Sequence, residues 1–352
     1  MAPPAVVPIR RRARLPAVVA AIALIAVACG RTASASPSET VRATPPSSAS
    51  PSASPSPSGA TFPLELTDDE GTTVEIPAEP ETIVSLTPAV TETLFALGVG
   101  DRVAARSEDT YHFPPEAESI PIVTAFGSSG LTVNIEAIVG AEPDVVFAGG
   151  NFGTPPDAIA RLRELDIPVV VVYAASVDAA FEDIELIGRA TGREAESEQI
   201  VGTMRDAFDD IEAAAAAEDR PRVFYETGTD TTGTVYGVAD NAFVTEMIQL
   251  AGAEPVTTGS PTDYAMPLER LISENPEIIL LSDAAFGETP ELVAKRPGWG
   301  VLTAVRNGDV RPIDDQTVTR PGPRLFLGLH LLASTIHDGI DLPEPSAIPA
   351  VP

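Results

Sequence analysis

The sequence predicts an α/β fold made of two lobes with a related plan, and three observations point to it. From Ile83 onward, short apolar runs of strand length alternate with amphipathic helical segments. The stretch VNIEAIVGAEPDVVF at 133–147, a helix, a proline and a strand, returns at 266–280 as MPLERLISENPEIIL. A shorter pair, TETLFALG at 91–98 and TEMIQLAG at 245–252, repeats in the same order. Because fully apolar strands are typical of sheets covered on both faces, we expect parallel sheets in these lobes.

The first half of this alternation begins with an apolar strand at 83–86. Thr87 follows the strand and Pro88 comes next, so we expect Thr87 to cap a helix that ends at Gly98. The other elements expected in this half are strands at 144–148 and 169–173 and helices at 157–165 and 181–190.

A long, charge-rich helical stretch at 194–218 separates the two halves and ends in a run of alanines. Beyond it the alternation restarts. The elements expected there are strands at 223–225 and 278–281 and helices at 243–250 and 268–273. The spacing between the copies differs for the two repeated blocks, so loop lengths have diverged between the lobes.

The composition fits globular lobes and disfavours one class of partner. The chain has 352 residues, of which 44% are hydrophobic, and this length accommodates two domains of ordinary size. It carries 22 basic and 51 acidic side chains, for a net charge of −29. Such an acidic surface repels phosphate backbones, so we expect no nucleic-acid partner. Solubility alone is a sufficient reason for the acidity.

The first 28 residues have the pattern of a signal peptide. Arginines at 10–12 and 14 precede an apolar run at 17–28, which is shorter than the about 20 residues that span a membrane. The run ends at Cys29, the only cysteine of the chain, which predicts a protein without disulfides. The sequence AVACG resembles a bacterial lipobox, in which the cysteine becomes the lipid-bearing first residue, although Ala26 stands where leucine is usual. The alternative is a buried thiol without a function.

The segment after Cys29 is dominated by Ser, Pro, Ala and Thr up to Ala60. Such a composition buries too little apolar surface to fold, so we expect a tether of about 30 residues with a span of roughly 30 Å. The predicted organisation is a signal peptide (1–28), a lipidated cysteine with a disordered tether (29–61), an N-terminal lobe (62–192), a connecting helix (193–219), a C-terminal lobe (220–342) and a disordered tail (343–352).

Several motifs resemble one known family. ETIVSLTPAVTETLFALGVGDRVAA, PPEAESIPIV, LRELDIPVVVV, RPGWGVLTAVRNGDVRPID and RPGPRLFLGL occur in the order found in substrate-binding lipoproteins of ABC importers for iron chelates and vitamin B12. The resemblance runs from about Thr73 to His337. It implies a class III periplasmic-binding-protein architecture: two Rossmann-like lobes joined by a single long rigid helix, with the ligand cleft between them. The stretch at 194–218 matches that helix.

The resemblance also gives the repeated unit a role. In such proteins a glutamate on each lobe docks onto arginines of a two-fold permease dimer that works with an ATPase, and Glu136 and Glu269 fall on the matching positions. A duplicated carboxylate suits a symmetric partner. The alternative is structural, because an acid in the first turn of a helix is stabilised by about 0.3–1 kcal/mol. Glu92 and Glu246, the acids of the shorter repeat, are expected to face solvent.

Candidate ligand-binding residues are sought beyond the carboxyl ends of the strands, where ligands bind in α/β folds. The loops just before the helices that carry Glu136 and Glu269 add Phe126 and Tyr264. An aromatic-lined cleft with a cationic anchor suits a large chelate. The candidates are Tyr111, Phe126, Tyr225, Tyr264 and Arg320. Core packing is the alternative for each aromatic residue, and Arg324 is interpreted as structural. His112 is either an axial ligand for haem iron or an ordinary loop residue, whereas His330 and His337 fit packing or surface positions.

Rival functions find little support. Three scattered histidines do not predict a bare-metal site. A hydrolase is disfavoured because no G-x-S-x-G motif is present and leucine at 292 excludes an S-x-x-K site at the single lysine, Lys295. We therefore expect no enzyme and no covalent cofactor. The predicted protein is an exported monomer, lipid-anchored on the outer face of the cytoplasmic membrane. It binds a metal chelate (a ferric siderophore first, cobalamin second, haem third) and delivers it to an ABC importer.

Overall fold

The computed structural model describes residues 60–127, 130–150 and 153–344. The predicted signal peptide, Cys29 and nearly all of the tether lie outside the described residues, as does the tail from residue 345 onward. No helix in the described ranges is both long enough and apolar enough to cross a membrane.

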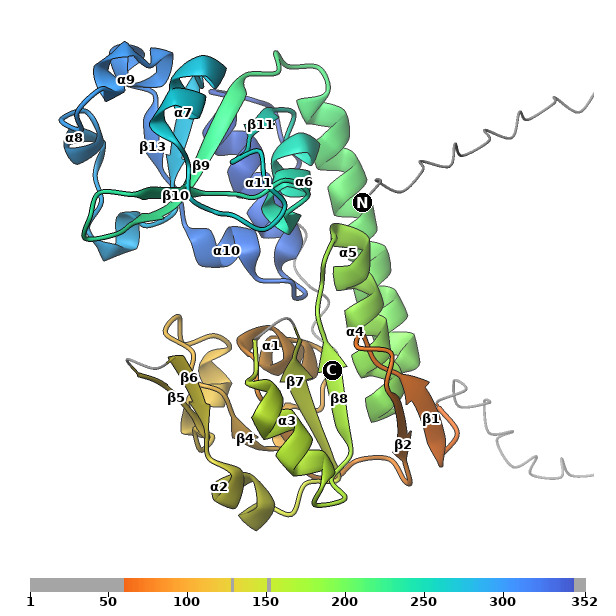
Figure 1. The fold of residues 1–352 in the computed structure, drawn as a ribbon. Helices are drawn as coiled ribbons and strands as arrows, with labels where there is room; N and C mark the ends of the chain where they lie inside the picture. Colours follow the sequence, from red (N-terminus) through yellow and green to blue (C-terminus); the bar gives the residue numbers. More distant parts are fainter. Residues whose placement is uncertain (1–59, 128–129, 151–152, 345–352) are drawn as a thin grey trace, which may run out of the picture. The chain divides into compact units, whose positions relative to one another are not determined.

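The N-terminal lobe is built on a parallel sheet, as predicted, and its strand order is β4-β3-β7-β8 (Figure 1). Every residue of β3, β7 and β8 is buried, because both faces of this sheet are covered. The strands are β3 (Ile83–Ser85), β4 (Val103–Arg106), β7 (Val145–Gly149) and β8 (Val169–Val172).

The first helix of this lobe has the predicted cap. The Val90 N–H donates to Oγ1 of Thr87 at 3.2 Å, Pro88 is the first helical residue, and Gly98 has a φ of +74° just after the helix. The helical segments of this lobe are α1 (Pro88–Ala96), η1 (Gly100–Arg102), η2 (Pro115–Ser119), α2 (Ile135–Gly140), α3 (Pro156–Arg163) and α4 (Val177–Thr191).

Two antiparallel hairpins complete the lobe: β1 (Leu64–Thr67) with β2 (Thr73–Ile76), and β5 (Thr124–Gly127) with β6 (Gly130–Val133). The β1–β2 turn is tied to β8, because the Asp68 carboxylate accepts from the Val171 N–H at 3.2 Å and from Arg163 at 2.8 Å. The segment that leads into β5 pairs with the carboxyl end of β4, because Ile122 and Arg106 form an isolated parallel β-bridge.

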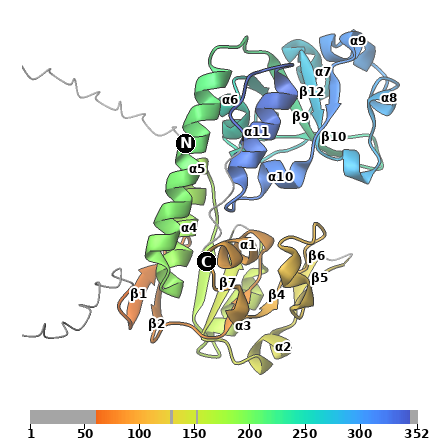
Figure 2. The ribbon, with the colours of Figure 1, turned by 180° about the vertical axis from the view of Figure 1, so that it is seen from behind.

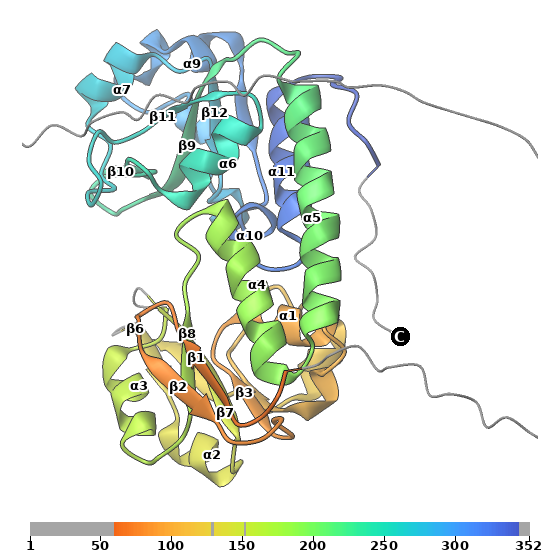
Figure 3. The same ribbon diagram turned by 90° about the vertical axis from the view of Figure 1, so that its right-hand side faces the viewer.

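A long helix connects the halves as predicted. Gly192 ends α4 with a left-handed conformation (φ +70°), and α5 (Glu194–Ala215) follows at once. The buried residues of α5 recur every three to four positions, which is the helical period. This stripe packs on α4 and also on α6 and α11 of the second lobe, as Figures 2 and 3 show.

The C-terminal lobe has a sheet with the order β10-β9-β12-β13, in which β11 also pairs with β9. Its pairs are parallel except that of β10 with β9. The strands are β9 (Arg222–Thr229), β10 (Val235–Gly237), β11 (Glu254–Val256), β12 (Ile278–Leu281) and β13 (Val310–Pro312). The helical segments are α6 (Phe243–Leu250), α7 (Leu268–Glu274), η3 (Ala284–Phe286), α8 (Pro290–Val293), η4 (Trp299–Val301), α9 (Thr303–Asn307), α10 (Asp315–Thr319) and α11 (Leu325–Ile336).

The doubled sequence unit is also a doubled structure. In both lobes a short helix, α2 or α7, leads into a central strand, β7 or β12. Glu142 and Asn275 end the two helices at matching positions, and both have a positive φ, 51° and 47°. The next strand pairs at the same register in each lobe, because Val146 pairs with Val169 and the matching Ile279 pairs with Val310.

One buried apolar cluster is continuous through both lobes. It contains Ile83 and Phe147 of the first sheet, Val223 and Leu280 of the second, and the inward faces of α1, α4, α5, α6 and α11. Two smaller clusters fill the opposite face of each sheet. Because the large cluster includes the connecting helix, a change in the distance between the lobes would have to open packed core.

A buried carboxyl group, Asp183 on α4, is only 6% exposed. Burial, a hydrogen bond with Asp69 and the charges of Asp69 and Glu182 raise the pKa of Asp183 to about 9. The ordinary value of an aspartate is about 3.9. Asp183 is therefore neutral in the folded protein at pH 7, and folding takes up a proton. Because the folded-state pKa is the higher one, stability falls as the pH rises from about 4 to 9.

Asp183→Asn should raise the free energy of unfolding by about 1–4 kcal/mol at pH 8, because asparagine is neutral without a bound proton. The gain should shrink toward pH 4. Urea unfolding at both pH values measures it, with Glu185→Gln on the same helix as the control. Equal gains at the two pH values would contradict the assigned titration.

Candidate functional site

The polar side chains of both sheets gather at the carboxyl ends of the parallel strands, the edge where α/β folds bind ligands. In the first lobe the chain after β4 carries Ser107 and Asp109. In the second lobe Asp283 follows β12, and Asp314 and Asp315 follow β13. Two ion pairs between the lobes show that the two edges meet.

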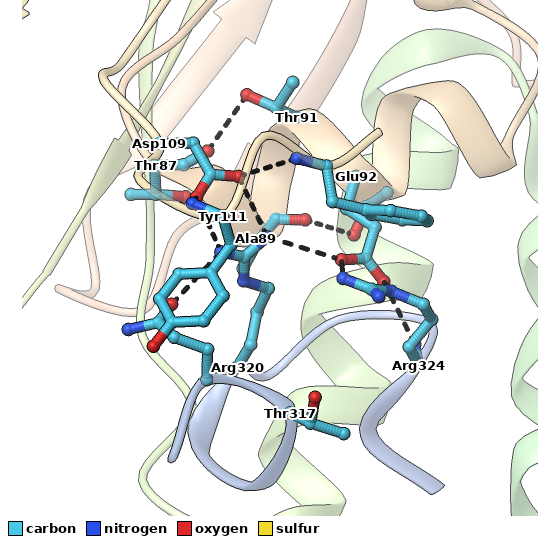
Figure 4. A network of polar contacts seen from close by, with 12 residues as sticks. Thr87, Ala89, Thr91, Glu92, Asp109, Tyr111, Thr317, Arg320 and Arg324 are labelled. Carbon is cyan, nitrogen blue, oxygen red and sulfur yellow. Dashed lines mark hydrogen bonds and ion pairs between the residues drawn. The ribbon is translucent and has the colours of Figure 1, made fainter. Parts of the chain in front are cut away.

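The first contact between the lobes is the ion pair of Asp109 with Arg320 (Figure 4). Nη2 of Arg320 donates to Oδ1 of Asp109 at 2.8 Å and Nη1 donates to Oδ2 at 3.0 Å. Both side chains are 7% exposed. Burial alone raises the pKa of Asp109, but hydrogen bonds from Arg320 and from the backbone of Tyr111 and Phe113 hold it below its ordinary value. The pair is therefore ionised.

The second contact is the ion pair of Glu92 with Arg324. The guanidinium donates through Nε and Nη2 to the two carboxylate oxygens, both at 2.9 Å, and Arg320 lies 3.7 Å from the same carboxylate. The ring of Phe113 lies against the Arg324 guanidinium, 3.3 Å from its centre. Glu92 is 3% exposed, so the prediction that it faces solvent is wrong. The sequence predicted that Glu92 lies on a helix. It did not show that residues of the second lobe, far along the chain, cover this position.

Glu246, the matching acid of the shorter repeat, is also not a free surface acid. It is half-buried on α6, and its carboxylate accepts from the Val177 N–H at 2.8 Å. Val177 is the first residue of α4, so this contact joins the second lobe to the chain of the first. A carboxylate at a helix start satisfies a free N–H and the helix dipole. Both acids of this repeat therefore bind across the lobes.

A further ion pair lies inside the second lobe. Nη2 and Nη1 of Arg296 donate to the Glu226 carboxylate at 2.5 and 2.8 Å, and the guanidinium packs on Trp299. Burial raises the pKa of Glu226 despite the hydrogen bonds from Arg296. Nearby, Oδ1 of Asp283 is buried without a hydrogen-bond partner within the described residues, and burial raises the pKa of that carboxyl as well.

Three of the predicted ligand residues are exposed on loops or edges. Tyr111 is 38% exposed after β4, Phe126 is 71% exposed on β5, and Tyr264 is 51% exposed before α7. Burial first, and then the charges of Asp314 and Asp315, raise the pKa of Tyr111. The phenol of the first lobe therefore lies within reach of the second lobe.

The structure differs from the prediction at Tyr225 and Arg320. Tyr225 is fully buried and donates its hydroxyl to Asp315 at 2.8 Å. The physical reason is that β9 continues to Thr229 by pairing with β10, so Tyr225 lies inside the strand instead of beyond its end. Arg320 is held by Asp109, so its guanidinium is a contact between the lobes in this structure.

Sequence reasoning missed Phe286, which is 89% exposed in η3 after β12. Tyr173, which was expected to end a strand and is not among the candidates, is 43% exposed after β8. The rule that selected Tyr111 also selects these two, since each follows the carboxyl end of a parallel strand. What the sequence did not show is which rings the neighbouring elements leave uncovered.

The histidines do not form a metal site. His112 is an exposed loop residue whose Nδ1 lies 3.2 Å from Glu118. His337 is buried beside the Ala251 carbonyl, in agreement with a packing role. Within the described ranges, no three His, Cys, Asp or Glu side chains come close enough to hold a metal ion.

The predicted docking acids have equivalent places. Glu136 and Glu269 are exposed in the first turns of α2 and α7, one on each lobe. Neither carboxylate makes a hydrogen bond or ion pair within the described part of the chain. A docking role remains a prediction at this point.

Two α/β lobes whose strand ends meet, joined by one helix within a shared core, define a two-lobed solute-binding architecture. The chain belongs to the periplasmic binding protein family, whose model matches residues 83–317. It is 32% identical over 282 residues to the ABC transporter substrate-binding lipoprotein YvrC of Bacillus subtilis, covering 78% of this chain and 86% of that one.

Other relatives agree with this assignment. The chain is 28% identical over 287 residues to a cobalamin-binding protein of Halobacterium salinarum, covering 79% of this chain and 75% of the relative. The crystal structure of the vitamin B12 binding protein BtuF of Vibrio cholerae superposes with a TM-score of 0.62 at 24% identity, over 73% of this chain and 97% of that one. The structural likeness shows that the fold is shared.

Glu92→Gln should lower the free energy of unfolding by about 2–4 kcal/mol, because it leaves Arg324 without its carboxylate and removes the second carboxylate beside Arg320, which keeps only Asp109. Glu75→Gln, which changes an exposed acid of β2, is the matched control and should stay within about 0.5 kcal/mol of the parent. Urea unfolding of both variants measures the difference. Equal midpoints would show that the pair between the lobes contributes nothing to stability.

Proposed function

We propose that this protein captures a metal chelate outside the cytoplasmic membrane and delivers it to an ABC importer. A ferric siderophore is the first ligand class, cobalamin the second, and haem the alternative. The observation that carries the proposal is a set of exposed aromatic rings in both lobes. Tyr111, Tyr173 and Phe286 follow parallel strands, Phe126 lies on β5, and Tyr264 lies before α7. Large chelates with extended apolar surface are bound by such rings, with a few polar groups that fix orientation.

The charges at the strand-end edge of the two lobes favour some ligand classes over others. Three arginines of this edge, Arg296, Arg320 and Arg324, are each bound to carboxylates, whereas the buried Arg106 at the end of β4 donates to the Ala117 and Ser107 carbonyls. The acids Asp283, Asp314 and Asp315 make no ion pair with them. A chelate with several negative charges would meet net repulsion there, whereas a neutral or cationic one would not. This supports neutral or cationic ferric hydroxamates and cobalamin over anionic ferric catecholates and haem with its two propionates.

Delivery to a permease is supported by the doubled acids. Glu136 and Glu269 are exposed, without partners in the described part of the chain, and placed equivalently on the two lobes. Each offers a carboxylate to a guanidinium, a pairing that is directional and charge-assisted. The permease dimer with its ATPase is the proposed partner, and this protein is proposed to act by binding alone, as a monomer.

The anchor is proposed from the sequence and from the relatives. The YvrC protein of Bacillus subtilis is named a lipoprotein. Lipid on Cys29 and the tether at 29–61 would hold the lobes at the outer face of the cytoplasmic membrane, where the permease opens. Both segments lie outside the described residues.

Thermal unfolding with candidate ligands tests the proposed function. A ligand at 100 times its Kd should stabilise the protein by about 2.7 kcal/mol. We expect this with a neutral or cationic ferric hydroxamate or with cobalamin, and a smaller effect with a ferric catecholate or haem. Phe286→Ala should reduce the shift, whereas Leu292→Ala, an exposed apolar change on α8, should not. No shift with any of the four would overturn the proposal, and a preference for the anionic pair would overturn the charge argument.

A further inference from the structure

The docking acids have a second feature in common, an exposed aliphatic residue three positions later. Val139 follows Glu136 on α2 and is 41% exposed. Ile272 follows Glu269 on α7 and is 39% exposed. The residue just before each aliphatic, Ile138 or Leu271, is buried in its lobe, so each helix is anchored by one apolar residue and presents another.

A single exposed aliphatic residue is no evidence of a binding surface, because folded proteins expose many such residues. Here the exposure is repeated at equivalent positions of the doubled unit, on two lobes whose loop lengths differ. The two helices also end alike, with a left-handed residue at the same place, so both aliphatic residues stand on the same local backbone. The repeat therefore preserves an apolar residue that neither lobe uses for its core.

Helix geometry joins each aliphatic residue to its acid. Residues three apart lie on the same helix face, with Cβ atoms about 5–6 Å from each other. Glu136 with Val139, and Glu269 with Ile272, thus form one small surface on each lobe, which we term the acid–aliphatic footprint. A carboxylate beside an aliphatic group matches a cationic group beside an apolar socket.

We propose that both lobes bind the permease through this footprint, and that the aliphatic residue of each contributes to the binding. The partner fits one description: a two-fold symmetric membrane protein that offers, in each of two equivalent subunits, a guanidinium beside an apolar socket. This rests on the proposed docking function and adds to it the apolar half of the contact. An anionic lipid surface is a poorer match, because it repels the two carboxylates.

The experiment first identifies the partner in intact membranes. The full-length chain carries a photoreactive phenylalanine at 139, at 272 or, as a control, at 122. Ile122 is the matched control because it is exposed (51%) and lies outside the repeat. We expect positions 139 and 272 to cross-link to the same segment of one membrane protein, since equivalent subunits present the same surface. Cross-links to different proteins, only to a second copy of this chain, or to none would overturn the footprint.

The second arm measures the Kd of the cross-linked permease, purified in nanodiscs, for four forms of the full-length chain. Val139→Thr with Ile272→Thr should weaken binding about tenfold, because a hydroxyl replaces a methyl group of Val139 and the ethyl group of Ile272 in the apolar contacts. Ile122→Thr should stay within about twofold. Melting temperatures should be unchanged, since all three residues are exposed.

The charge-reversed form, Glu136→Lys with Glu269→Lys, separates the two claims. If it loses binding while the double threonine form binds like Ile122→Thr, the aliphatic half is wrong and acid docking stands. If it binds like the parent, the proposed docking itself is wrong. Loss in both forms, with an unaffected Ile122→Thr, is the expected result.

Discussion

The pairing of two acids of the first lobe with two arginines of the second is the interaction on which the rest of the structure depends. Asp109 and Glu92 bind Arg320 and Arg324 with side chains that are almost wholly buried, apart from the 27% exposed Arg324. Such pairs are directional, and removing one partner leaves a costly buried charge. Together with the apolar cluster that continues through the connecting helix, these ion pairs fix the position of the strand-end edge of one lobe relative to that of the other.

The sequence predicted what is encoded locally. The Thr87 cap, the apolar β7 and β8, the connecting helix α5 and the doubled helix–strand unit follow from periodicity and from capping residues within a few positions. Burial by a distant segment could not be predicted. Glu92 was interpreted as a surface acid because the residues that bind it, Arg320 and Arg324, are encoded over 200 residues later. Tyr225 was placed at an edge because the pairing that lengthens β9 is tertiary.

Two kinds of exposed apolar residue in the described chain suit different partners. Exposed aromatic rings lie on loops, in η3 and on β5 in the two lobes, whereas Val139 and Ile272 lie on the helices that precede β7 and β12. The first kind suits a large, partly apolar ligand, and the second suits a protein surface. Under the proposed function, ligand capture and docking would use separate surfaces. The equivalent helices would give the proposed docking surface the same duplication that a two-fold partner has.

The distance between the lobes tests this account most directly. Spin labels on Glu116→Cys and Lys295→Cys, exposed positions on the two lobes, in a chain with Cys29→Ser, report that distance by pulsed electron resonance. We predict one narrow distribution that moves by less than about 2 Å when a chelate binds and that broadens in the Glu92→Gln protein. A broad distribution in the parent chain, or a large compaction on binding, would contradict the fixed spacing of the lobes.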